Sequence, residues 1–224
     1  MAIALPKLYP IPKLYPILDS SALPTRNHPE YNEYLTRLGR SLADAGLTLL
    51  EYRNKPATDA ELLADAEILR AAMPETRLIL DDRVDVALAA GFNGVHVDTG
   101  DLPPAIARKL MPPGSIIGTS AGGAATLRAA LELAQSQFLD YIAFGPIFPT
   151  TTKQTSTQPI GLEGVRRFRT LAGPEITLVA AAGITLEAAP AILAAGASTV
   201  AVAAAIFRTP DPAAEIRRWL IELA

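Results

Sequence analysis

The stretch RLILDDRVDVALAAGFNGVHVD, residues 77–98, contains two short apolar runs separated by a segment of helical pattern. The runs RLILD (77–81) and GVHVD (94–98) are largely apolar on both faces, which is typical of strands buried within a parallel sheet. The intervening VDVALAAG ends at a glycine, which commonly marks the end of a helix. This unit predicts two parallel strands connected by a helix that covers them.

The same alternation continues along the chain in both directions. Six more runs with strand character are LYPILD (14–19), LTLLEYR (47–53), SIIGTS (115–120), YIAFG (141–145), TLVAAAG (177–183) and TVAVAAA (199–205). About eight strand–helix units in a chain of this length predict an α/β fold, a single (β/α)₈ TIM barrel over residues 13–224. The rival is a doubly wound open sheet, but the Gly-x-Gly-x-x-Gly fingerprint is missing after the first strand.

The segment PKLYP occurs twice, at 6–10 and 12–16, and only the second copy runs into ILD. Residues 1–12 are therefore interpreted as an N-terminal extension. The start of the chain lacks the long apolar region of a signal peptide, and no segment is long and apolar enough to span a membrane. We expect a cytoplasmic protein with no membrane partner, and a homo-oligomer is compatible with the sequence.

Composition excludes several classes of site. The net charge is −3 and basic residues form no long run, so nucleic acid is not an expected partner. The absence of cysteine excludes disulfides, thiolate metal sites and a cysteine nucleophile. With only two histidines, any metal must be held by oxygen.

Polar residues at the carboxyl ends of the predicted strands converge on one rim of a barrel, where catalysis takes place in this fold. Glu51, Arg53 and Lys55 are spaced by two, so their side chains share one face of a strand. Two cations side by side suggest that an anion binds between them. A pair of surface salt bridges is the alternative interpretation.

Asp82 and Asp101 follow the third and fourth predicted strands. Two carboxylates from neighbouring loops suit Mg²⁺, which completes its coordination with water and phosphate oxygens. Both could instead cap the helices that follow them.

A second group of donors follows the fifth and sixth predicted strands, and consists of Ser120, Thr150, Thr151, Thr152 and Lys153. Hydroxyl groups and a compact ammonium suit phosphate oxygens, although a solvated threonine-rich loop is the alternative. Gly183 and the backbone of Ala203 and Ala204 match the phosphate site found after strands 7 and 8 of many barrels. Two anion-binding sets predict two phosphorylated substrates.

Several of these stretches resemble the thiamine phosphate synthase family, and more broadly the superfamily it shares with the thiazole tautomerases. They include LLEYRNK, LILDDRVDVALAAGFNGVHVDTGDLP, IIGTSA, DYIAFGPIFPTTTK and AGITLEAAPAILAAGASTVAV, in family order from about residue 14 to 207. The resemblance implies a barrel that joins a hydroxymethylpyrimidine diphosphate to a thiazole phosphate with Mg²⁺, giving thiamine phosphate and pyrophosphate.

By position, the resemblance implies three groups of site residues. Contacts to the pyrimidine diphosphate would come from Glu51, Tyr52, Arg53, Asn54, Lys55, Asp81, Ser120 and Lys153. Asp82 and Asp101 would bind Mg²⁺. The thiazole phosphate would be held by Thr150, Thr151, Thr152, Gly183, Ala203 and Ala204.

The sequence departs from the family pattern at five positions. Glu51 stands where the family commonly has glutamine, Asp81 replaces asparagine, and Ala182, Ala204 and Gly122 replace glycine, serine and histidine. The first two add negative charge near a diphosphate, which a metal or a proton would have to compensate. A tautomerase that uses His96 or Glu51, and a non-catalytic phosphate-binding barrel, are the alternative functions.

Overall fold

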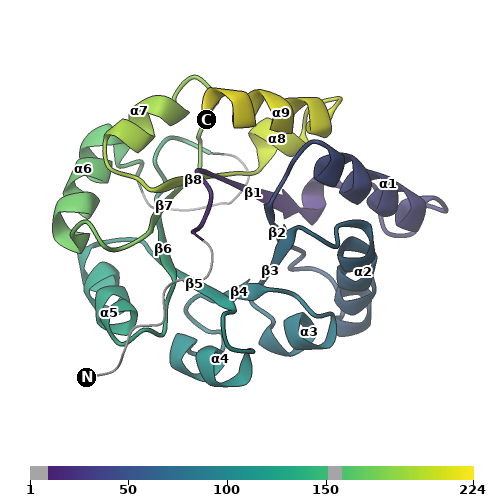
Figure 1. Ribbon diagram of the computed structural model, residues 1–224, viewed down its shortest axis with the longest axis horizontal. Coiled ribbons are helices and arrows are strands. Elements are labelled where there is room, and N and C mark those ends of the chain that lie inside the picture. The colour runs from purple at the N-terminus through teal and green to yellow at the C-terminus, as the bar shows by residue number, and fades with distance from the viewer. Residues whose placement is uncertain (1–9, 151–157) are drawn as a thin grey trace.

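The computed structural model describes residues 10–150 and 158–224, and eight parallel strands form a closed barrel within them. The strands follow one another around the ring in sequence order, and β8 pairs with β1 to close it (Figure 1). The strands are β1 (Leu14–Asp19), β2 (Leu49–Arg53), β3 (Arg77–Asp81), β4 (Gly94–His96), β5 (Ile116–Ala121), β6 (Tyr141–Phe144), β7 (Leu178–Ala181) and β8 (Thr199–Val202). The predicted (β/α)₈ barrel is confirmed.

Helices surround the strands in an outer ring (Figure 1). After the short 3₁₀ turn η1 (Ser20–Ala22), they are α1 (Tyr31–Asp44), α2 (Asp59–Ala72), α3 (Val84–Ala89), α4 (Pro104–Leu110), α5 (Ala124–Gln135), α6 (Gly161–Ala172), α7 (Ala189–Ala194), α8 (Ala204–Phe207) and α9 (Pro212–Glu222). None of the helices in the described ranges is long and apolar enough to cross a membrane.

Local sequence explains where these helices lie. In α1 the buried residues Tyr31, Leu35, Leu38 and Leu42 recur every three or four positions and form one apolar stripe against the sheet. At the start of α2, the Thr58 hydroxyl accepts a hydrogen bond from the backbone of Glu61, whose carboxylate accepts one from the backbone of Thr58. This reciprocal pair satisfies backbone donors that would otherwise lack partners at the helix end.

The predicted eighth strand, 199–205, is too long. The structure ends β8 at Val202 and begins α8 at Ala204. The run of alanines at 203–205 is apolar, so it looks like strand, but alanine is also the strongest helix former. The strand therefore ends three residues earlier than the apolar pattern suggests, and a short helix begins at the rim of the barrel.

Two apolar cores hold the barrel together. The larger core lies between the strands and the helices, and the smaller one fills the barrel interior with side chains such as Tyr15, Leu49, Ile79, Tyr141 and Val179. The interior core is packed tightly enough that two strands need glycine, Gly94 in β4 and Gly118 in β5. At Gly118 in β5, a Cβ atom would lie 1.9 Å from the Tyr141 ring, so only glycine leaves room for that ring.

The described part of the predicted extension lies at the amino end of the barrel. The carbonyl of Pro10 accepts a hydrogen bond from Arg77, the first residue of β3, and that of Pro12 accepts one from Thr199, the first residue of β8. Ile11 packs against the interior core. Residues 1–9 lie outside the described part of the chain.

Candidate active site

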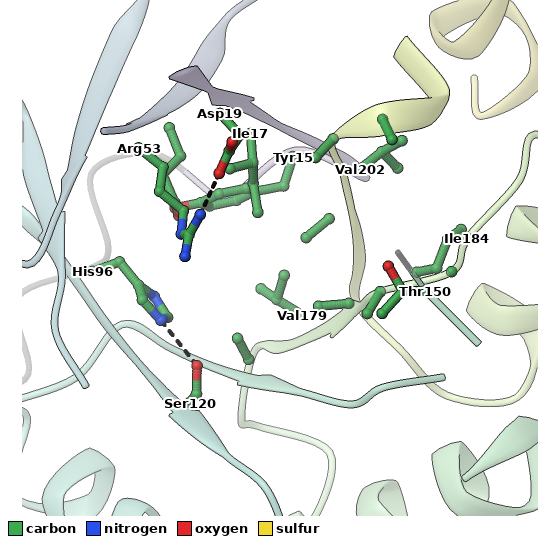
Figure 2. Close-up of a pocket in the computed structure, with 18 of the residues that line it drawn as sticks. Tyr15, Ile17, Asp19, Arg53, His96, Ser120, Thr150, Val179, Ile184 and Val202 are labelled. Atoms are coloured by element: carbon green, nitrogen blue, oxygen red, sulfur yellow. Dashed lines mark hydrogen bonds and ion pairs between the residues drawn. The ribbon is translucent and has the colours of Figure 1, made fainter. Parts of the chain in front are cut away.

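A cavity of about 430 Å³ opens at the carboxyl ends of the strands (Figure 2). Its walls come from all eight strands and the loops that follow them. Of the residues predicted for the site, those that line it are Glu51, Arg53, Lys55, Asp81, Ser120, Thr150, Gly183, Ala203 and Ala204. Thr151, Thr152 and Lys153 lie outside the described residues.

Alternation along β2 divides the segment EYRNK between two environments. Glu51, Arg53 and Lys55 face the cavity, as their spacing of two predicts. The structure does not bring Tyr52 and Asn54 to it. Tyr52 points out of the barrel, where its hydroxyl donates to the carboxylate of buried Asp65 on α2 at 2.6 Å, and the Asn54 amide donates to the Tyr52 hydroxyl at 3.0 Å.

Arg53, the last residue of β2, and Lys55, just after the strand, lie among carboxylates at the cavity. Arg53 donates to Asp19 at the end of β1, and its Nε lies 3.2 Å from Asp81 Oδ2 (Figure 2 shows the pair with Asp19). Lys55 pairs with Asp82, and its Nζ lies 3.3 Å from the same Asp81 oxygen. Among the described residues, no group makes a hydrogen bond to that oxygen, so the two nearby positive charges stabilise it mainly by their proximity. The salt-bridge interpretation is therefore correct in part, but the bridges line the mouth of the barrel.

Asp82 and Asp101 do not cap helices. The residue before α3 is Arg83 and the residue before α4 is Pro103, and neither aspartate accepts a capping hydrogen bond from those helices. Asp101 instead accepts the backbone N–H of Asp98 at 2.8 Å. Asp82 is held at a φ of 65°, and its Oδ1 is buried without a hydrogen-bond partner among the described residues.

The two aspartates lie close enough to interact. Burial and the neighbouring Asp82 carboxylate raise the pKa of Asp101, against the effect of the Asp98 N–H. Adjacent carboxylates with an unused oxygen fit a divalent cation that accepts only one or two protein ligands. Within residues 10–150 and 158–224, no cluster of three or more His, Asp or Glu side chains could hold a metal, so further ligands would have to come from substrate and water.

Ser120, near the end of β5, contacts His96, the last residue of β4, and Asp98, two residues after that strand. Its hydroxyl lies 3.0 Å from His96 Nε2 (Figure 2). Its backbone N–H donates to Asp98 Oδ1 at 3.0 Å. Burial works against the ionised form of Asp98, but His96 and Ser120 lower its pKa well below the usual range. Asp98 therefore remains a carboxylate that orients both groups.

The opposite wall is formed by the ends of β7 and β8 and is mostly backbone and small side chains. Gly183 has a φ of 71°, and a Cβ there would lie 2.5 Å from the Phe148 carbonyl oxygen, so glycine is required. Ala182 beside it also adopts a positive φ, 72°, without being glycine. Ala203 and Ala204 border the same wall. Because these residues are small, their side chains leave space for an anion to approach the backbone at this wall.

Four polar groups at this cavity were missed or given no specific role by the sequence reasoning. They are Asp19 at the end of β1, Asp98 after β4, and two buried tyrosines, Tyr15 on β1 and Tyr141 on β6. Asp19 follows the first strand directly, so the rule that selected the other rim residues could have found it. The tyrosines look like ordinary core residues in the sequence, and only their convergence in the barrel reveals a polar role.

Comparison with known proteins gives a consistent result. The family model described as thiamine monophosphate synthase matches residues 14–206. The thiamine-phosphate synthase of Koribacter versatilis is 41% identical over 177 residues, which covers 79% of this chain and 81% of the relative. That of Chlorobium phaeovibrioides is 41% identical over 172 residues, 75% of this chain and 78% of the relative.

A solved structure agrees with the sequence relatives. The thiamine phosphate pyrophosphorylase from Pyrococcus furiosus superimposes with a TM-score of 0.76 at 30% identity. The superposition covers 94% of this chain and 95% of that structure. The similarity therefore extends over the whole barrel, including both walls of the cavity.

Proposed function

This chain belongs to the thiamine monophosphate synthase family and is a transferase of thiamine biosynthesis, and we propose that the cavity at the barrel mouth is where it joins its two substrates. The substrates are 4-amino-5-hydroxymethyl-2-methylpyrimidine diphosphate and a thiazole phosphate, and the products are thiamine phosphate and pyrophosphate. The two sequence relatives carry synthase names, so neither the tautomerase nor the non-catalytic alternative is favoured. We place the reaction in the cytoplasm.

The observation that carries the proposal is the convergence of Arg53 and Lys55 on one cavity wall. In the proposed reaction the exocyclic C–O bond of the pyrimidine breaks while positive charge builds on the adjoining carbon. Pyrophosphate leaves with the bonding electrons, so the catalyst mainly has to stabilise the departing anion. Fixed cations do this without reorganising, and loss of one such donor typically lowers the rate about 10²- to 10³-fold.

The negative charge that Asp81 adds, where the family commonly has asparagine, is balanced by two neighbouring cations. Asp81 lies between Arg53 and Lys55, so its carboxylate holds both cations at the cavity. Burial raises the pKa of Asp81, whereas His96 and Lys55 oppose that rise. A diphosphate that enters would share these cations with the carboxylates already bound to them. The balance supports binding of the unmodified substrate at this departure from the family pattern.

We assign the remaining roles by position. Ser120 and Lys153 complete the diphosphate site, and Asp82 and Asp101 hold Mg²⁺, which would neutralise charge on the diphosphate oxygens when bound. The threonines of the 150–152 segment, with Gly183 and the backbone at Ala203 and Ala204, hold the thiazole phosphate. No side-chain nucleophile is needed, which agrees with a chain that lacks cysteine.

The test is direct synthesis. Purified protein incubated with both substrates and Mg²⁺ should form thiamine phosphate, measured by chromatography, and release an equal amount of pyrophosphate. Lys153→Ala should lower the rate about 10²- to 10³-fold, whereas Lys109→Ala on exposed α4 serves as the matched control and should not. Absence of product from folded protein, with both substrates shown to be intact, would reject the proposal.

A further inference from the structure

A continuous line of hydrogen bonds crosses the barrel interior beneath the cavity. The Tyr15 hydroxyl donates to Glu51 Oε2 at 2.7 Å and lies 2.7 Å from the Tyr141 hydroxyl. That hydroxyl lies 2.8 Å from His96 Nδ1, and His96 Nε2 lies 3.0 Å from Ser120 Oγ. All five residues border the cavity. We call these residues the interior chain.

Counting hydrogens gives the interior chain a direction. Each tyrosine has one O–H, so when Tyr15 donates to Glu51, the Tyr15 oxygen can only accept from Tyr141. The Tyr141 oxygen must then accept from His96, whose Nδ1 therefore carries a hydrogen. From His96 Nδ1 onward, every donor along the line points toward Glu51. Its Oε2 is thus occupied by a donated hydrogen bond and is kept as an acceptor.

The second oxygen of Glu51 is different. No described residue donates a hydrogen bond to Oε1, and it is not among the buried polar atoms that are sealed from solvent without a partner. The same cavity has an apolar lining from Ile17, which pairs in register with Glu51, and from Ala143, Val179 and Ala201. Apolar walls suit a flat ring, and Glu51 lines the same cavity with an oxygen that accepts no hydrogen bond from the described residues.

From this arrangement we propose that Glu51 recognises the aminopyrimidine ring as a neutral acid, with Oε1–H donating to a ring nitrogen while Oε2 accepts from the adjacent amino group. The proposal rests on the proposed function, because it identifies how the pyrimidine substrate is bound. An aminopyrimidine edge carries one acceptor beside one donor, which a carboxylic acid matches and a carboxylate does not. One proton enters with the substrate and lies between oxygen and ring nitrogen. No other bond changes.

The groups around Glu51 favour holding that proton. Burial and Asp81 on β3 raise the pKa of Glu51, against opposing effects of His96, Tyr15 and Arg53, to about 7. Tyr141 also faces it from β6 through Tyr15. His96 is itself protonated near neutrality, because Asp98, Glu51 and Asp81 raise its pKa to about 9 despite burial.

The first test is the pH profile of kcat/KM for the pyrimidine diphosphate, which reports ionisation of the free enzyme. Wild type should lose about tenfold per pH unit above a break near 7. Glu51→Gln offers a permanent donor and acceptor, so it should remain active and lose this decline. Tyr15→Phe removes a hydrogen bond that lowers the pKa of Glu51, so its break should move to higher pH. Tyr31→Phe loses a buried hydroxyl on α1, outside the cavity, and is the matched control.

The second test needs no turnover. Calorimetry of pyrimidine diphosphate binding at pH 8, in buffers of different ionisation enthalpy, should show about one more proton taken up by wild type than by Glu51→Gln. Inorganic pyrophosphate should show no such difference. Equal proton uptake, or the same alkaline decline in Glu51→Gln as in wild type, would overturn the inference. Absence of product with all variants would instead reject the proposed function, since binding is measured separately.

Discussion

Replacing Gly118 by alanine should destabilise the protein by displacing Tyr141 from the barrel interior. The new Cβ would lie 1.9 to 2.3 Å from three ring atoms, and the ring is fully enclosed. Overpacking of a core typically costs about 1–3 kcal/mol. The Tyr141 hydroxyl also loses its contacts with Tyr15 and His96, at about 1 kcal/mol for each hydrogen bond.

The sum is about 3–5 kcal/mol, which for a domain of this size corresponds to a fall in Tm of about 6 to 20 °C. Urea denaturation and a thermal melt measure it. Gly122→Ala, just beyond β5, is the control, because its Cβ would meet no atom within 4 Å and its stability should change little. If Gly118→Ala unfolds within about 0.5 kcal/mol of wild type, the packing argument is wrong.

Three further predictions follow from the same structure. Ala182→Gly should raise the free energy of unfolding, measured by urea denaturation, by about 0.5–1 kcal/mol. Alanine at the left-handed φ of residue 182 costs about 1–2 kcal/mol, which exceeds the entropy that a more flexible unfolded glycine loses on folding. A loss of stability would contradict this. Asp82→Asn should raise the Mg²⁺ concentration for half-maximal synthesis at least about tenfold. The control Asp85→Asn changes an exposed carboxylate on α3 and should leave this concentration unchanged, and equal Mg²⁺ dependence of the two variants would remove Asp82 from the metal site. The free energy of unfolding should fall as pH rises between 6.5 and 9, because folded His96 keeps a proton that the unfolded chain releases, and His96→Gln should lack this fall.

Much of the barrel could be predicted from the sequence because its strands are short apolar runs separated by helices. The ends of β1 and β3 were predicted correctly, since in each a charged residue closes the run. The end of β8 was not, because alanine fits both a strand and a helix. The final helix α9, which buries Trp219, was not among the predicted elements.

In the candidate site, too, some features could be predicted from the sequence and others could not. Alternation along one strand was enough to place Glu51, Arg53 and Lys55 together. Applied to the intervening residues, the same rule would have placed Tyr52 outside the barrel, but the resemblance carried the whole segment over. The interior chain could not be predicted, because its members come from five strands and their meeting depends on the barrel's closure and on the space left at Gly118.

The pairing of β8 with β1 has a consequence for how the protein is made. Seven strands emerging from a ribosome leave β1 and β7 as open edges, and such edges readily recruit strands from other chains. β8 covers both open edges by pairing with β1 and β7. A nonsense mutation just before Thr199 should therefore yield insoluble protein and no weakly active fragment, because the cavity at the barrel mouth forms only when the barrel closes.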